Sequence, residues 1–137
     1  MVTYLACTDG MEASEAIGEI LETELAEADR VRVITISDEP DEELQRAVDG
    51  LAETVSTAGA SVESGVLGTS GGGGPVYEAL SEANRIDADM IFVGLRRRSR
   101  TKRYLSGTFS YDLLDRTSRP VTLVPLADVT SEIDPSS

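Results

Sequence analysis

Apolar positions along this chain alternate between short continuous runs and helical stripes. The runs at residues 2–7, 31–37 and 90–94 are short and contain β-branched side chains, a pattern typical of strands. Between the first two runs, apolar residues recur three and four positions apart, which predicts an amphipathic helix. The members of this stripe are Ala13, Ala16, Ile17, Ile20, Leu21 and Leu25.

The alternation continues to residue 125. A second stripe lies between Pro40 and Gly59, which are residue types that favour the start and the end of a helix. Its apolar members are Leu44, Ala47, Val48, Leu51, Ala52 and Val55. The next elements are predicted to be a weak edge strand, a helix with Pro75 in its first turn, a second helix and a last strand. They span residues 60–67, 75–84, 107–116 and 121–125, with the strand at 90–94 between the two helices.

Strands that alternate with helices predict an α/β domain with a single parallel sheet and helices on both faces. The all-apolar run Met90–Gly94 supports this, because such a strand must be covered on both sides. We expect one domain at residues 1–126 and a flexible, polar, acidic tail at 127–137. No apolar run is long enough for a membrane span and no signal peptide is visible. The lone Cys7 fits a reducing compartment, so a cytoplasmic location is expected.

The chain is strongly acidic. The chain has 12 basic and 25 acidic residues and a net charge of -13, with Lys102 as its only lysine. An acidic surface almost without lysine favours a salt-rich cytoplasm, where screening removes self-repulsion, so a halophilic origin is expected. An ordinary acidic protein is the alternative. Binding to nucleic acid is unlikely at this net charge.

Residue types that are missing exclude several classes of site. The sequence contains no histidine and one cysteine. Catalytic sites that use His as acid or base, and zinc sites of His or Cys ligands, are therefore excluded. Enzymatic activity beyond trace nucleotide hydrolysis is not expected, and no metal site is predicted.

Six of the twelve basic residues are concentrated between Arg96 and Arg103. They follow Gly94, at the end of a predicted strand, and precede Gly107 and Thr108, at the start of a predicted helix. A helix N-terminus with a nearby glycine and hydroxyl groups favours phosphate, and the basic residues strengthen that interpretation. A solvated basic loop and a simple helix cap are the alternatives.

The stretch from Met90 to Pro125 resembles the C-terminal half of the universal stress protein family. That family's nucleotide motif is a glycine, two residues, a glycine, nine residues and Gly-Ser or Gly-Thr; its ends fall on Gly94 and on Gly107-Thr108. The first turn, Thr8-Asp9-Gly10, is also similar. The resemblance covers residues 2–125 and implies a sheet of strand order 3-2-1-4-5, with an adenine nucleotide between the first and fourth strands.

The resemblance also implies site residues and partners. Asp9 and the backbone of Ile36 would face adenine, and the remaining residues would line ribose and phosphates. The predicted nucleotide-binding residues are Thr8, Asp9, Ile36, Gly94, Leu95, Arg96, Arg97, Arg98, Gly107, Thr108, Phe109 and Ser110. The ligand would be ATP, ADP or AMP, with Mg²⁺ accompanying it. A homodimer is implied through the last strand, with Val121, Leu123 and Val124.

Four departures and alternatives stay open. The middle glycine of the motif falls on Arg97, so the arginine loop could dock an acidic partner or another anion in place of a nucleotide. Asp9 could cap the first helix. The run Ser70–Gly74 favours a flexible loop over a phosphate loop, because it follows the edge strand. Cys7, where the family has proline, is interpreted as a small buried strand residue.

Overall fold

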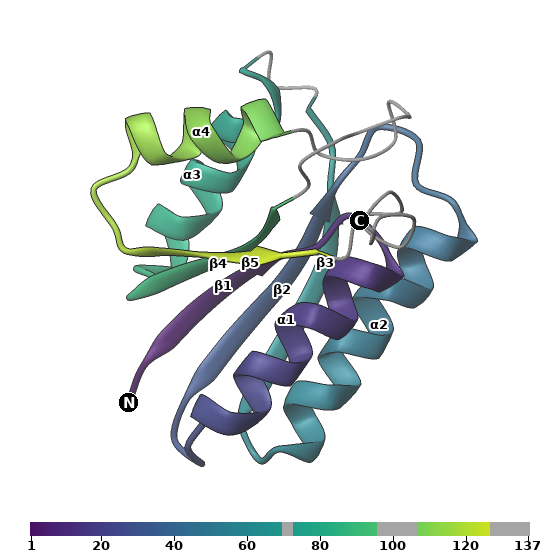
Figure 1. Cartoon of the computed structure of the whole chain (residues 1–137), viewed down its shortest axis with the longest axis vertical. Helices are drawn as coiled ribbons and strands as arrows, with labels where there is room; N and C mark the ends of the chain where they lie inside the picture. The colour runs from purple at the N-terminus through teal and green to yellow at the C-terminus, as the bar shows by residue number, and fades with distance from the viewer. Residues whose placement is uncertain (70–72, 96–106, 127–137) are drawn as a thin grey trace, which may run out of the picture.

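A computed structural model describes residues 1–69, 73–95 and 107–126 of this chain. Strands and helices alternate along all of it, as the spacing of apolar residues predicted (Figure 1). The elements are β1 (Thr3–Cys7), α1 (Met11–Glu24), β2 (Arg30–Ile36), α2 (Glu42–Thr57), β3 (Ser61–Leu67), α3 (Gly74–Ile86), β4 (Met90–Leu95), α4 (Gly107–Arg116) and β5 (Val121–Pro125). The predicted α/β class is confirmed. The predictions for residues 70–72, 96–106 and 127–137 lie outside the described residues.

The five strands form one parallel sheet in the order β3-β2-β1-β4-β5. This confirms both the parallel sheet and the strand order that the family resemblance implied. It also confirms the third strand as an edge strand. The run Met90–Gly94 is confirmed as a strand covered on both faces, because β4 contacts α1 on one face and α4 on the other. The strand order reverses between β1 and β4, so that the loops after these two strands diverge to opposite faces of the sheet.

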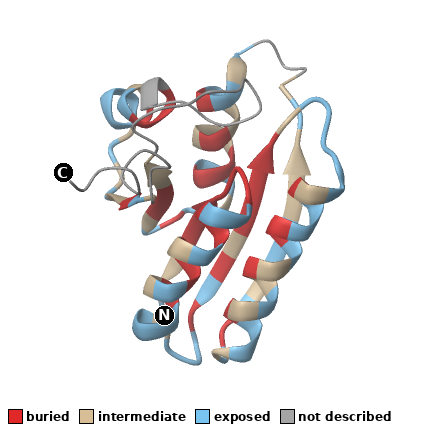
Figure 2. Cartoon of the chain, turned by 45° about the vertical axis from the view of Figure 1, so that its right-hand side comes forward, coloured by how far each residue is buried: buried red, intermediate tan, exposed pale blue. Residues whose placement is uncertain are grey.

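Helices cover both faces of this sheet. α1 and α2 pack on one face, and α3 and α4 on the other (Figure 1). Buried residues lie along the strands and on the inward sides of the helices (Figure 2). Alternate residues of a strand enter different cores, as the pleat requires. In β2, Val31 and Val33 join the core beneath α1 and α2, whereas Ile34 and Ile36 join the core beneath α3 and α4.

Several predicted helix ends need correction. Helix α1 ends at Glu24, and Leu25 caps it in an extended conformation. The N-cap of α1 is Gly10, so the hypothesis that Asp9 caps this helix is wrong. Helix α3 begins one residue before Pro75 and continues to Ile86, because Asp87 closes it in the left-handed region at φ 53°.

The second helix begins later than Pro40 suggested. Its N-cap is Asp41, whose side chain accepts a hydrogen bond from the N–H of Leu44. The prediction that Gly59 ends this helix is confirmed. The C-cap of α2 is Ala58, and Gly59 follows it with a φ of +102°, a conformation that favours glycine.

Candidate functional site

The turn after β1 is held by its own hydroxyl groups. The N–H of Thr8 donates to the carbonyl of Ile34 at 2.9 Å, which extends the β1–β2 ladder by one residue. The buried Thr8 hydroxyl lies 3.0 Å from the Gly10 carbonyl and 2.8 Å from Ser14 Oγ. Ser14 in turn donates to the Ala47 carbonyl at 2.7 Å. The Thr8 side chain thus joins β1 to α1 and α2, and positions this turn.

Asp9 follows in the same turn and is only 6% exposed. Its neighbour Gly10 is extended, and α1 begins at Met11, so the carboxylate lies one residue before the helix cap. The structure therefore places Asp9 just after the carboxyl end of β1. The ligand was predicted to bind at this end of the sheet.

Strand β2 extends past β1 at this edge. The last paired position of β1 is Cys7, opposite Ile34, whereas β2 continues to Ile36. The N–H of Arg30 donates to Val2 of the β1 side, and the N–H of Ser37 donates to Leu67 of β3. Because N–H and C=O directions alternate along a strand, the peptide groups of Ile36 point to the β1 side, beyond its last pair. The geometry allows the role that was predicted for the Ile36 backbone.

Gly94 and Leu95 end the fourth strand, next to β1. A Cβ atom at Gly94 would lie 3.2 Å from the Cβ of Ala13 and 3.2 Å from Cδ1 of Leu126. Glycine at this position therefore lets α1 approach the end of β4 closely. Leu95 is half-buried, and its carbonyl accepts from the N–H of Leu126 at 3.1 Å.

Helix α4 begins at Gly107, as the motif predicted. Phe109 is 5% exposed and belongs to the core beneath α3 and α4, so its side chain is structural. Ser110 is 1% exposed, and its Oγ is buried without a hydrogen-bond partner, the one such side-chain atom in the part of the chain that the structure describes. A buried hydroxyl without a partner costs about 1–3 kcal/mol, so a bound group that completes it is favoured.

The structure places five of the twelve predicted residues at the carboxyl end of the sheet. Thr8, Asp9, Ile36, Gly94 and Leu95 all lie at or just after the carboxyl ends of β1, β2 and β4. Gly107, Thr108, Phe109 and Ser110 form the first turn of α4. Arg96, Arg97 and Arg98 lie outside the described residues. Sequence patterns missed Ser14, whose small polar side chain on the inward face of α1 was the available signal.

Neither the acidic side chains nor the Cys7 thiol in the described residues is arranged to bind a metal ion or to act as a nucleophile. Within the described ranges, no three residues among His, Cys, Asp and Glu come together to hold a metal ion. Burial raises the pKa of Cys7 to about 12, with the nearby Glu82 carboxylate adding to the effect. The thiol is 1% exposed and remains protonated at neutral pH, as expected for a packed strand residue.

Comparisons with known proteins identify relatives of this architecture. The model of the universal stress protein family matches residues 3–125. A universal stress protein from Archaeoglobus fulgidus is 17% identical, with a TM-score of 0.68 over 90% of this chain and 93% of its own. A universal stress protein solved with cAMP is 19% identical, with a TM-score of 0.70 over 92% and 98%.

A third structure, the Archaeoglobus fulgidus protein in complex with dAMP, has a TM-score of 0.67 at 19% identity over 90% and 97% of the two chains. These likenesses confirm the fold. A search of curated proteins gave no match. None of the helices in the described part of the chain has the length and apolar character that crossing a membrane requires.

Proposed function

The chain belongs to the universal stress protein family, and we propose that it binds an adenine nucleotide at the carboxyl ends of β1 and β4. The relatives solved with cAMP and dAMP support this class of ligand. The fold supports this place for the site, because parallel α/β sheets bind ligands where the strand order reverses.

Each described residue has a role in this proposal. The Ile36 peptide groups form hydrogen bonds with the adenine edge, and Asp9 accepts from the ribose or adenine side. Gly94 and Leu95 form the wall next to the sugar. The N–H groups of the first turn of α4 hold phosphate, since they carry the positive end of the helix dipole.

The observation that carries the proposal is the buried, unpartnered hydroxyl of Ser110. Ser110 lies in the first turn of α4, a helix that contacts β4. A phosphate oxygen is an acceptor that satisfies this hydroxyl, so the residues present fit a nucleotide. Mg²⁺ would enter with ATP, held by the phosphates.

Isothermal titration calorimetry with ATP, ADP and AMP in KCl tests the proposal. We expect saturable binding to the wild type, and binding about tenfold weaker to Ser110→Ala, because one hydrogen bond to a charged group is lost. Ser64→Ala is the matched control: Ser64 is exposed on edge strand β3, and its loss should leave affinity unchanged. A folded wild type that binds none of the three nucleotides at millimolar concentration would refute the proposal.

Arg97 provides a second test, because it occupies the position of the family's middle glycine. If the arginine contacts the phosphates from outside, Arg97→Gly should weaken ATP binding. If Arg97→Gly instead creates binding that the wild type lacks, the loop serves another anion or an acidic protein, and the nucleotide proposal fails for the natural chain.

We further propose binding without turnover beyond trace hydrolysis. The absence of histidine from the sequence and the protonated state of Cys7 support this, since neither an imidazole base nor a thiolate is on hand. Phosphate release from ATP, measured in molar KCl, should stay near the rate without protein. Clear turnover that Asp9→Asn abolishes would contradict it.

A homodimer through β5 is also proposed. In β5 the N–H of Leu126 and the carbonyl of Pro120 point to β4, so the N–H groups of Val121 and Leu123 point away from the sheet. Val121 and Leu123 are half-buried, whereas Val124 is buried in the core of its own chain. Sedimentation equilibrium should give twice the 14.6 kDa of one chain; a monomer at high concentration would contradict the dimer.

A further inference from the structure

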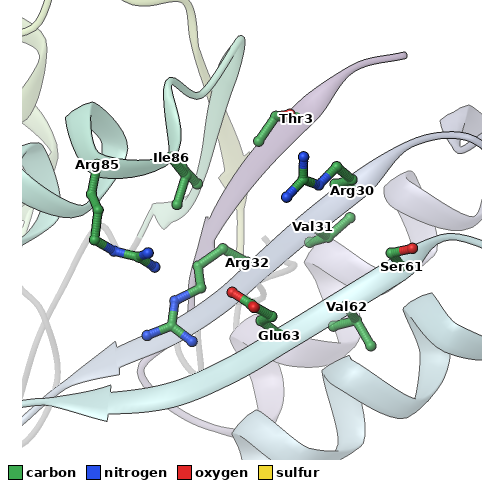
Figure 3. Close-up of a pocket in the computed structure, with 9 residues that line it drawn as sticks. All are labelled: Thr3, Arg30, Val31, Arg32, Ser61, Val62, Glu63, Arg85 and Ile86. Atoms are coloured by element: carbon green, nitrogen blue, oxygen red, sulfur yellow. The ribbon is translucent and has the colours of Figure 1, made fainter.

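A polar cavity of ≈ 530 Å³ lies at the amino ends of β1, β2 and β3, at the opposite end of the strands from the proposed nucleotide site. It exists because α3 packs over β1 and β2 and α4 packs over β4, which leaves this face of β3 open, where Ser61 and Glu63 are exposed. Figure 3 shows Arg85 and Ile86 of α3 on one side of the cavity and the strand residues on the other. Its volume is within the range of small-molecule sites.

The lining of this cavity is basic, on a chain with a net charge of -13. Arg30, Arg32 and Arg85 are three of the six basic residues that lie outside the cluster at 96–103. Arg30 and Arg32 come from alternate positions of β2, so both side chains lie on the face of the sheet that α3 covers in part. Arginines gathered from two elements favour an anion as occupant.

One buried carboxylate holds two of these arginines. Glu82 is 7% exposed, accepts from Arg32 Nε at 2.5 Å and from Arg85 Nη2 at 2.6 Å. Gly65 leaves room for the guanidinium of Arg32, since a Cβ there would lie 3.1 Å from Nη2. Two guanidinium groups share one carboxylate, so this triad retains a positive charge.

The other charged groups around the cavity are Arg30 and Glu63. Arg30 is exposed, and its side chain has no hydrogen-bond or ion-pair partner among the described residues. The exposed Glu63 interacts electrostatically with Arg85, and Asp89 at the margin accepts from the N–H of Thr3. The cavity thus offers a free guanidinium, a second one that is 57% exposed, and the hydroxyls of Thr3 and Ser61.

We infer that this cavity is a second ligand site, which binds a small anion that carries a phosphate group between Arg30 and Arg85. The donors come from β1, β2, β3 and α3, around the cavity, which suits the tetrahedral oxygens of phosphate better than the single plane of a carboxylate. Thr3 and Ser61 contribute hydroxyl donors, and Glu63 limits the affinity by repulsion.

Inorganic phosphate and pyrophosphate are the probes for the experiment. We titrate each into ¹⁵N-labelled full-length protein without nucleotide, at constant ionic strength, and follow the amide signals. Shifts at Thr3, Arg30 and Ser61 are expected. Shifts confined to the first turn of α4 would mean that phosphate enters only the proposed nucleotide site, and no shift at millimolar pyrophosphate would also overturn the inference.

Three variants that should change pyrophosphate binding in different ways make the test specific. Arg30→Gln should weaken pyrophosphate binding about tenfold, since one charge-assisted contact is lost. Glu63→Gln should strengthen it, because a like charge leaves the site. Arg46→Gln on α2 makes the same charge change on a side chain that is 68% exposed and outside the cavity, and should have no effect.

If Arg30→Gln and Arg46→Gln weaken pyrophosphate binding equally, the effect comes from the overall charge of the protein, and the inference of a specific site is wrong. Citrate separates the two chemical classes of anion. If citrate binds the cavity as tightly as pyrophosphate, the assignment to phosphate is wrong.

Discussion

Two buried serines differ in whether the folded chain satisfies their hydroxyl groups. Ser14 donates to the Ala47 carbonyl and contacts Thr8, so its hydroxyl contributes to the fold. Ser110 is equally buried but has no partner. A hydroxyl that costs stability and is nevertheless present points to a requirement outside the folded chain itself.

Replacing these two serines with alanine should therefore have opposite effects on stability. Ser14→Ala should lower the free energy of unfolding by about 1–2 kcal/mol, because the Ala47 carbonyl and Thr8 lose their partner. Ser110→Ala should leave it unchanged or raise it by about 1 kcal/mol. Urea unfolding without ligand measures both. A loss of stability in Ser110→Ala equal to that in Ser14→Ala would show that the Ser110 hydroxyl is satisfied.

Gly94 should be needed for packing as well as for the ligand. In Gly94→Ala the new methyl group would meet Ala13 and Leu126 at 3.2 Å, and a short side chain such as Ala13 has no freedom to move away. We expect a loss of about 1–3 kcal/mol in unfolding free energy. The control is Gly50→Ala within α2, where a Cβ meets nothing within 4 Å and helix propensity should add about 0.5–1 kcal/mol. Stabilisation by both changes would contradict the close approach.

At the scale of elements, α3 is fastened to β2 by the triad of Arg32, Glu82 and Arg85. The hydrogen bond from Arg85, and then that from Arg32, lowers the pKa of Glu82 against the opposing effect of burial. The same contact raises the pKa of Arg85. The triad thus links the position of a whole helix to one ionised carboxylate.

Acid should weaken this attachment. Because the pKa of Glu82 is lower in the folded state, its stabilisation is complete above the unfolded pKa of about 4.3 and is lost as pH falls through the folded value. Glu82→Gln should cost about 2 kcal/mol at pH 7 and flatten the fall in stability below about pH 4.5. Urea unfolding between pH 7 and pH 3 measures this.

The exposed Glu53 on α2 is the matched control for that series. Glu53→Gln should change stability by less than about 0.5 kcal/mol and keep the acid dependence of the wild type. If Glu82→Gln also keeps the wild-type pH profile, the triad does not carry the acid dependence.

The elements were more predictable than the contacts between them. The apolar run at Met90–Gly94 predicted a strand covered on both faces, because a strand with one face in water alternates apolar and polar residues. Gly94 and Gly107 indicated the proposed nucleotide site, because their spacing matches the motif of the universal stress protein family. The position of Glu82 beneath Arg32 depends on residues fifty positions apart, which no local spacing reveals. The alternation of arginine and valine in Arg30–Val33 was the one local signal of the cavity at the amino ends of the strands.

At the scale of the whole molecule, charge is the dominant feature. With 25 acidic and 12 basic residues, half of the latter between Arg96 and Arg103, the rest of the surface is strongly negative. We propose that the protein works in a salt-rich environment, since the repulsion within such a surface diminishes as salt shortens the screening length.

Salt should therefore raise thermal stability in a manner that depends on ionised carboxylates. At pH 7 the midpoint of thermal unfolding should rise as KCl increases from about 0.05 M to about 1 M, over which the Debye length falls from more than 10 Å to about 3 Å. At pH 4.5, near the sequence pI of about 4.3, the rise should be much smaller. Equal rises at both pH values would attribute the effect to general salt exclusion and contradict the proposal.

Strand β2 extends two residues beyond the last pair with β1, and the register of β2 keeps this extension in place. A slip of β2 by one position would turn Arg32 into the apolar core that Val31 and Val33 now fill, so the core itself locks the strand. The packing of the core therefore also fixes how far the Ile36 peptide groups extend beyond the end of β1. The Ile36 peptide groups, which we propose to bind the base, are therefore held in place by the core and do not depend on the loops.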